Sequence, residues 1–132
     1  MKFKSKALMT IFTSILLSGS SVALAATWTI GSVSVPAWGG SARTSESNTK
    51  ATTSNYASFN GDVQPNSFGY TVTLADSNNA SRTSQVGLYL NKTSRASDNT
   101  LTVNHYGYGK VFSKGYEPNS SRVKLHFSAD KK

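Results

Sequence analysis

The sequence contains no cysteine, and this absence excludes several classes of protein at once. A disulfide framework and lipid attachment at a cleavage-site cysteine both require the thiol. Small secreted eukaryotic domains are usually held together by disulfides, so an exported chain without them is more typical of a bacterium. Burial must then offset about 1.5 kcal/mol of ordering cost per residue, which commits most apolar strand residues to the core.

Histidine is nearly as scarce, and this argues against metal sites and acid–base catalysis. His105 and His126 are the only two, and no HxH or HExxH pattern occurs, so both are predicted to be structural or solvated. The serines form no Gly-x-Ser-x-Gly elbow. Asp76 and Asn78 resemble the start of a calcium loop, but Ser81 occupies the position that requires glycine. A non-enzymatic protein without a cofactor or a metal is therefore expected.

Acidic residues are few, whereas basic residues are not. The chain has 14 Lys and Arg residues against six acids, giving a formal net charge of +8. The acids are expected in loops or turns, a distribution that favours solvated turn formers over a pair of catalytic carboxylates. They are Glu46, Asp62, Asp76, Asp98, Glu117 and Asp130. The basic balance predicts attraction to polyanions.

The first 25 residues have the pattern of a secretory signal peptide. Lys2, Lys4 and Lys6 precede a short, mainly apolar stretch at residues 7–17, and Ala23-Leu24-Ala25 is a small-x-small cleavage site. Cleavage after residue 25 is predicted, and an uncleaved amphipathic anchor is the alternative. Residues 1–25 are thus the signal peptide and residues 26–132 a single secreted domain. Removing three of the 14 basic residues and none of the six acids lowers the net charge from +8 to +5.

Residues 68–90 carry the clearest structural signal in the mature chain. Phe68, Tyr70, Val72 and Leu74 alternate with smaller residues, and a second alternating run follows at residues 85–90. Alternation of this kind is typical of a half-buried strand, whose successive side chains point to opposite faces. The polar segment 76–82 between the two runs has turn composition. The stretch therefore predicts a long antiparallel hairpin.

Further strands are predicted on both sides of this hairpin. Residues 27–35 alternate with a change of phase at Gly31 and Ser32, which predicts a β-bulge, and Pro36 ends the strand. Residues 41–55 are polar and form either an exposed strand or, as we favour, a loop leading into a strand at 52–59. Turns are predicted at 60–61, 65–66 and 106–109, polar loops at 91–99 and 115–121, and strands at 100–105, 110–113 and 122–127.

No window after the signal peptide shows helical periodicity. Six or seven short strands separated by turn-rich loops predict an all-β fold, namely a small antiparallel β-sandwich or an open barrel.

The basic residues of the last quarter of the chain are interleaved with tyrosines. We predict a binding face made of Tyr106, Tyr108, Lys110, Lys114, Tyr116, Arg122 and Lys124. Such a face attracts wall teichoic acids or anionic lipid headgroups, and export argues against nucleic acid. The alternative is that these charges keep outer strands soluble and protect them from edge-to-edge pairing.

Three traits together resemble a group of exported bacterial proteins: the signal peptide, a body rich in Ser, Thr and Asn, and Gly/Tyr segments such as residues 106–109. The chain resembles small, cationic, cysteine-free exported proteins of Gram-positive bacteria, including lactococcin-972-like bacteriocins. This resemblance implies an all-β fold and action at the cell wall. Two hypotheses follow: a secreted protein loosely associated with the envelope or an extracellular partner, and a bacteriocin-like toxin acting on neighbouring cells.

Overall fold

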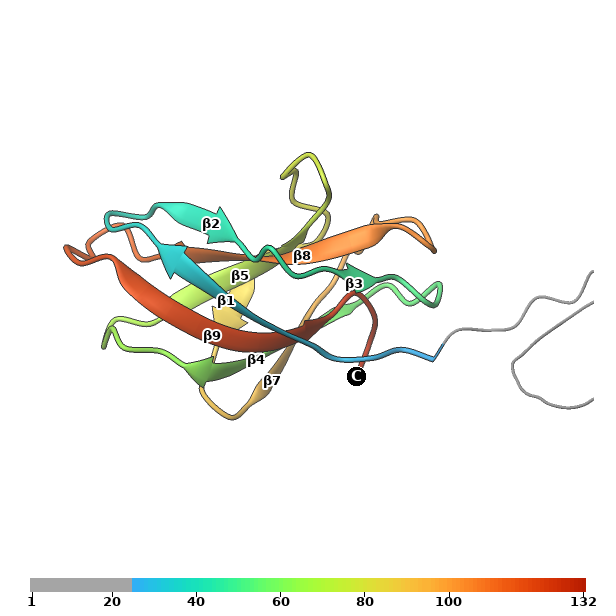
Figure 1. Ribbon diagram of the computed structural model, residues 1–132, viewed down its shortest axis with the longest axis horizontal. Coiled ribbons are helices and arrows are strands. Elements are labelled where there is room, and N and C mark those ends of the chain that lie inside the picture. Colours follow the sequence, from blue (N-terminus) through green and yellow to red (C-terminus); the bar gives the residue numbers. More distant parts are fainter. Residues whose placement is uncertain (1–24) are drawn as a thin grey trace, which may run out of the picture.

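The computed structural model describes residues 25–132, so the predicted signal peptide lies outside the described residues except for its last residue. This part of the chain is a β-sandwich of two antiparallel sheets that do not close into a barrel (Figure 1). Its strands are β1 (Thr29–Val35), β2 (Ser41–Arg43), β3 (Asn48–Thr49), β4 (Ala57–Val63), β5 (Tyr70–Ala75), β6 (Val86–Leu88), β7 (Thr93–Ala96), β8 (Tyr106–Ser113) and β9 (Ser121–Ser128). The all-β sandwich prediction is confirmed, with nine strands in place of six or seven. None of the described residues belongs to a helix able to span a membrane.

Strands that follow one another in the sequence often belong to different sheets. One sheet has the order β1-β9-β4-β7, and the other has the order β2-β8-β5-β6, with β3 also pairing with β8. The loop between β8 and β9 therefore crosses from one sheet to the other. In Figure 1, β8 lies toward the top of the view and β9 and β4 lie toward the bottom.

The core fills the space between the sheets. Inward positions alternate with outward ones along each long strand, as expected for packed sheets. On β9 the inward residues Val123, Leu125 and Phe127 are fully buried, which is the set that alternation predicts for this strand. Phe127 lies opposite Phe59 of β4 in the register, which ties the two central strands of that sheet together.

The predicted central hairpin is confirmed but is shorter than expected. β5 and β6 pair antiparallel, with Tyr70 opposite Leu88 and Val72 opposite Val86. Phe68 lies outside the paired residues and is exposed, because β5 begins only at Tyr70. The second neighbour of β5 is β8, so the hairpin lies at one edge of its five-stranded sheet.

The predicted β-bulge in the first strand is wrong. β1 pairs with β9 without a shift of register along its whole length, and Ile30 points outward, 63% exposed. Gly31 takes the inward position, where a Cβ atom would lie 2.8 Å from Cγ2 of Thr44. The apparent change of phase arises because a glycine occupies an inward position and a large apolar residue an outward one.

The segment 41–63 also differs from its prediction. The favoured loop at 41–55 contains the short strands β2 and β3, and the predicted turn at Asn60 and Gly61 lies within β4. A shift of register does occur in β4, between Gly61 and Val63. The Gly61 N–H donates to the carbonyl of Tyr89, just after β6, at 2.8 Å. An added Cβ atom would meet both Nε2 of Gln64 and this carbonyl, so no side chain fits here.

The segment 91–113 carries three further corrections. The predicted loop at 91–99 contains β7, and the predicted strand at 100–105 is irregular, with Asn104 in the left-handed region at φ 72°. The predicted glycine turn at 106–109 belongs to β8. Gly107 and Gly109 face inward there, where added Cβ atoms would lie 2.8 Å from Leu74 and 3.2 Å from Leu125. These glycines make room for core side chains.

Candidate binding surfaces

The residues predicted to form one basic, tyrosine-rich face lie on three different parts of the sandwich. They are Tyr106, Tyr108 and Lys110 on the outer face of β8; Arg122 and Lys124 on the outer face of β9; and Lys114 and Tyr116 in the loop between these strands. Because β8 and β9 belong to different sheets, their outward side chains point to opposite sides of the domain. The structure therefore corrects the single predicted face to three separate groups.

On the outer face of β8, the cations hold a neighbouring turn in place. The Arg43 guanidinium lies over the Tyr108 ring, 4.0 Å from its centroid, and donates to the Asp76 carbonyl at 2.9 Å. Lys110 donates to the Asn79 carbonyl at 3.0 Å. Both cations thus anchor the turn after β5, which is a packing role.

A pocket of about 200 Å³ lies beside this turn, with Tyr106 in its wall. The Asp76 carboxylate also lines it, and accepts hydrogen bonds from Arg82 Nε at 2.8 Å and from the N–H groups of Asn78 and Ala80 at 2.9 and 3.0 Å. The hydrogen bond from Arg82 is the main cause that holds the pKa of Asp76 below its usual value. Asp76 is therefore the cap of a turn, which explains its likeness to the start of a calcium loop.

On the outer face of β9, the cations have no acidic partner. Arg122 donates to the hydroxyl groups of Ser34 and Ser32 at 2.9 and 2.8 Å, and Lys124 is exposed beside it. The ion pairs within residues 25–132 join Lys50 to Asp130 and Arg82 to Asp76, and the Asp62 carboxylate is in contact with His126. The charges of Arg122 and Lys124 are therefore not compensated by any of the described carboxylates.

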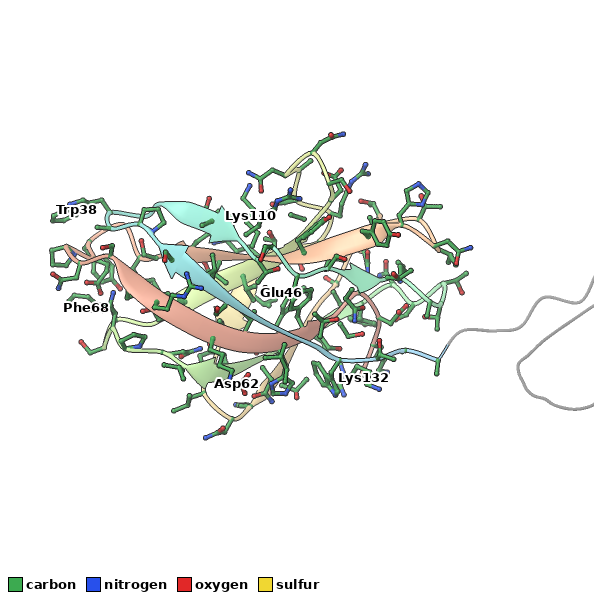
Figure 2. All side chains as sticks on the ribbon, in the orientation of Figure 1. Trp38, Glu46, Asp62, Phe68, Lys110 and Lys132 are labelled. Atoms are coloured by element: carbon green, nitrogen blue, oxygen red, sulfur yellow. The ribbon has the colours of Figure 1, made fainter. Side chains whose placement is uncertain are left out.

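Positive charge continues along this outer face toward the C-terminal residues. Arg95 projects from β7 and its Nε donates to the main-chain oxygen of Lys132 at 2.8 Å. The N–H of Lys132 donates to Ser58 of β4 at 2.8 Å, so the C-terminal segment crosses the outside of the sheet (Figure 2). We call this surface the basic face, defined by Arg95, Arg122, Lys124, Lys131 and Lys132. Asp62 is its one acidic side chain.

Asp62 and His126 form a contact that sequence reasoning missed. Nδ1 of His126 lies 2.9 Å from Oδ1 of Asp62, and the Trp28 ring packs edge-on against the imidazole at 4.7 Å. An aspartate that orients a histidine is part of many catalytic sites, but a nucleophile and a pocket are also needed. The pockets beside Tyr106 and beside Phe68 both lie elsewhere. Nor do three His, Asp or Glu residues converge as metal ligands anywhere in 25–132.

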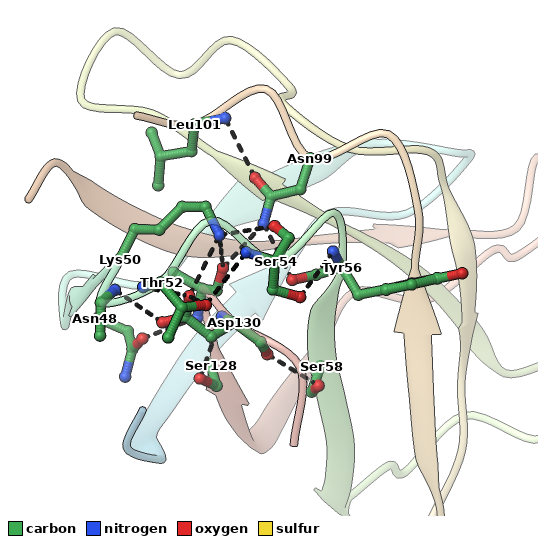
Figure 3. Close-up of polar contacts among 12 residues, drawn as sticks. Asn48, Lys50, Thr52, Ser54, Tyr56, Ser58, Asn99, Leu101, Ser128 and Asp130 are labelled. Atoms are coloured by element: carbon green, nitrogen blue, oxygen red, sulfur yellow. Dashed lines mark hydrogen bonds and ion pairs between the residues drawn. The ribbon is translucent and has the colours of Figure 1, made fainter. Parts of the chain in front are cut away.

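A buried ion pair links the segment after β3 to the segment after β9. The Lys50 and Asp130 side chains are 2% and 1% exposed, and Nζ lies 3.2 Å from Oδ1 (Figure 3). Lys50 also donates to the carbonyls of Ser54 and Ala129, at 2.8 and 3.2 Å. The ammonium group is thus surrounded by acceptors, as a buried cation requires.

The Asp130 carboxylate is equally well paired. Burial alone would raise the pKa of Asp130, but hydrogen bonds from the N–H of Ala51, from Thr52 and from Lys50 outweigh it and hold the pKa below 3.8. The prediction that the acids are solvated loop or turn residues is therefore wrong for Asp130, and also for Glu117 and Asp76, which are 2% and 9% exposed. It is wrong for Asp62 as well, which lies within β4. No sequence signal distinguishes Asp130 from an ordinary loop residue, because its partners Lys50, Ala51 and Thr52 lie far away in the chain.

One end of the sandwich gathers large exposed apolar side chains. Ten such side chains occur among the described residues, and six of them lie at this end, which we call the apolar end: Trp38, Val63, Phe68, Tyr89, Leu90 and Tyr116. They lie in, or directly beside, the loops 36–40, 64–69, 89–92 and 114–120. Figure 2 shows Trp38 and Phe68 together at the left of the domain.

Two aromatic rings of the apolar end are in contact, and a third lies across a hollow from one of them. Phe68 and Tyr116 pack edge to face with their ring centroids 4.8 Å apart. An open hollow of about 250 Å³ lies between Phe68 and Tyr89, with Lys114 also in its wall. Lys114 and Tyr116, two of the residues predicted from the sequence, are therefore part of this end.

Comparison with known proteins adds no relative. The chain matches no protein-family model, and no curated protein or solved structure is significantly similar to it.

Proposed function

We propose that the mature chain is a secreted, non-enzymatic protein that associates with anionic polymers of the bacterial cell envelope through its basic face. The observation that carries this proposal is the uncompensated charge of two exposed cations: Arg122, whose side-chain partners are serine hydroxyls, and Lys124 beside it. A cation that is paired within the protein has little left to offer a polyanion, whereas an unpaired surface cation attracts one. Secretion follows from the predicted signal peptide.

The geometry of the face suits a polymer. The cations are spread over the strands β9 and β7 and the C-terminal segment, with one acid, Asp62, already in contact with His126. An extended polyanion can contact several such charges at once, whereas a small substrate requires a concave site. Association of this kind is loose and depends on ionic strength.

Binding of residues 26–132 to isolated Gram-positive cell walls tests the proposal. We expect the wall-bound fraction to fall as salt rises from 0.1 to 1 M, because the screening length drops from about 10 Å to about 3 Å. Walls stripped of teichoic acids should bind less. The double variant R122Q/K124Q should bind roughly thirtyfold more weakly at low salt, from about 1 kcal/mol per cation.

A matched control carries the same charge change on the opposite sheet. R43Q/K110Q also removes two positive charges, but from the outer face of β2 and β8. We expect this variant to bind walls nearly as well as the parent protein. Equal losses in both double variants, or binding that ignores salt, would contradict the assignment to the basic face.

The second candidate function is a bacteriocin-like toxin, and the apolar end is the observation that favours it. A toxin must contact the target cell beyond its wall, and exposed Trp and Tyr side chains suit such contact. Purified residues 26–132 at micromolar concentration should then inhibit growth of indicator strains. Wall binding without any inhibition supports the adhesion function and counts against the toxin.

A further inference from the structure

The loops of the apolar end are tied to one another. The N–H of Trp38 donates to the Glu117 carbonyl at 2.7 Å, and Nδ2 of Asn66 donates to the Asn119 carbonyl at 3.0 Å. These bonds join the β1–β2 turn and the β4–β5 loop to the β8–β9 loop. The aromatic side chains at this end are therefore displayed by a hydrogen-bonded platform.

Trp38 is held outward at a conformational cost. Its φ angle is 58°, in the left-handed region that bulky residues rarely occupy, and its side chain is 66% exposed. The turn is fixed from below by Ser113, whose Oγ donates to the Pro36 carbonyl at 2.7 Å and accepts from the Gly39 N–H at 3.0 Å. Burial does not repay the strain at Trp38, and strained, exposed positions are frequent at functional sites.

The charges of these loops favour an anionic partner. Glu117 is the one carboxylate in the four loops, and it is buried, with Oε2 accepting from the Asn119 N–H at 3.0 Å. Two lysines remain at the surface: Lys114 beside the hollow, and Lys92, whose Nζ lies 5.6 Å from the Tyr89 ring centroid. Aromatic rings together with lysines are the composition of protein segments that lie at the interface of a lipid bilayer.

The aliphatic members of the patch distinguish a lipid from a sugar. A sugar site needs flat rings and hydrogen-bonding groups around a concavity, and Val63 and Leu90 provide neither. Projecting loops with aliphatic and aromatic side chains instead match the apolar boundary between headgroups and acyl chains. The open hollow beside Lys114 suits an anionic headgroup.

We propose that the apolar end is a second binding surface, which inserts its loop tips into the headgroup region of an anionic lipid bilayer. The side chains that enter are Trp38, Phe68 and Tyr116, and Lys114 pairs with lipid phosphate. This surface shares no residue with the basic face, and its action does not depend on wall binding.

Fluorescence of Trp38 tests this insertion directly. In a W28F background Trp38 is the sole tryptophan of residues 26–132. Vesicles of phosphatidylcholine and phosphatidylglycerol should shift its emission to the blue, and lipids brominated near the headgroup should quench it most strongly. With Trp28 retained, the triple variant W38A/F68A/Y116A should have a vesicle partition coefficient about a hundredfold lower than the parent protein. The reason is that the variant has lost the three aromatic rings whose transfer from water to the bilayer favours binding.

Exposed apolar side chains elsewhere provide the control. The variant I30A/Y56A/Y106A removes three comparable side chains outside the apolar end and should partition like the parent. Thermal unfolding of both triple variants tests whether each still folds. The proposal is overturned if vesicles leave Trp38 emission unchanged, if both triple variants lose equal affinity, or if soluble teichoic acid without lipid produces the same blue shift.

The two proposals fail separately. Loss of wall binding in R122Q/K124Q tests the basic face, and vesicle insertion by the same variant should persist at high salt once the rings have entered. A protein that ignores walls yet inserts into vesicles contradicts the proposed function alone.

Discussion

Replacing Asp130 by alanine should cost the domain a large part of its stability. The change removes the carboxylate partner of Lys50 and leaves a buried ammonium group with neutral carbonyl partners alone. Removing one partner of a buried ion pair typically costs about 3–5 kcal/mol. The free energy of unfolding of a small domain is about 5–15 kcal/mol, so at the low end of that range the substitution would remove nearly all of it.

The main-chain hydrogen bonds that the Asp130 carboxylate accepts add little to the cost of its removal. Those of Ala51 and Thr52 lie in a partly buried segment, where water can replace the lost acceptor. A loss of about 4 kcal/mol remains the expectation. It corresponds to a decrease in Tm of roughly 15–30 °C for a domain of this size.

Equilibrium unfolding in urea, followed by far-UV circular dichroism, measures the loss for D130A. The exposed acid Glu46 provides a control, since E46A should change stability by less than about 0.5 kcal/mol. In the double variant K50M/D130A no ammonium group is stranded, so it should be more stable than D130A. A cost below about 1 kcal/mol for D130A, or a double variant no better than the single one, would refute a buried charge at Lys50.

Three further outcomes follow from particular contacts. Hydrogen bonding lowers the pKa of Asp130 in the folded chain, so the ionised carboxylate stabilises the fold at pH values above its ordinary pKa of 3.8. This stabilisation disappears as the pH falls through the pKa of the folded state. Urea midpoints measured below about pH 4 should therefore decline more steeply for the parent than for D130N. G31A should cost about 1–3 kcal/mol in urea unfolding, because the added methyl group would lie 2.8 Å from Thr44, and an unchanged midpoint would show that Thr44 can move away freely. I30T should be neutral within about 0.5 kcal/mol whereas V33A should cost about 2 kcal/mol in calorimetry; the reverse ranking would restore the β-bulge and invert the faces of β1.

Strands in which every inward position is bulky were predictable from the sequence. In β9 the residues Val123, Leu125 and Phe127 fill successive inward positions, and the same holds for Tyr70, Val72 and Leu74 in β5. Each position then contributes to the alternation, because burial of apolar surface dominates the choice of face. The hairpin and the last strand could be located without any knowledge of their partners.

Glycine is where the prediction failed. The sequence predicts turns at Gly61, Gly107 and Gly109, yet all three lie inside strands. Glycine permits a turn, but it also leaves space for another side chain, and the local sequence is the same in both cases. For Gly107 the deciding neighbour is Leu74, from a strand more than thirty residues away, so only tertiary structure could tell the two roles apart.

The candidate face could not be assembled from the sequence for a topological reason. Lys110 and Lys124 are close in the chain and both alternate outward, but the loop between β8 and β9 crosses to the other sheet. Alternation gives the side of a strand and does not give the sheet to which the strand belongs. Arg95 lies outside the last quarter of the chain, in a segment that the sequence predicts to be a loop, and only the structure places it on β7 beside the C-terminal residues.

The apolar end was hidden in the sequence for the opposite reason. Trp38, Phe68 and Tyr116 are scattered, and each lies next to a glycine, in segments with turn composition. Large aromatic residues in turns are costly for a small domain that needs apolar area for its core, so their position is itself a signal of binding. β9 begins at Ser121, directly after the loop that carries Tyr116, and Arg122 is its second residue, so the basic face and the apolar end meet at one edge of the molecule. A domain that the basic face attracts to the envelope therefore has the aromatic rings of the apolar end close to the anionic lipid bilayer. Because the two surfaces are adjacent, both serve binding to the envelope.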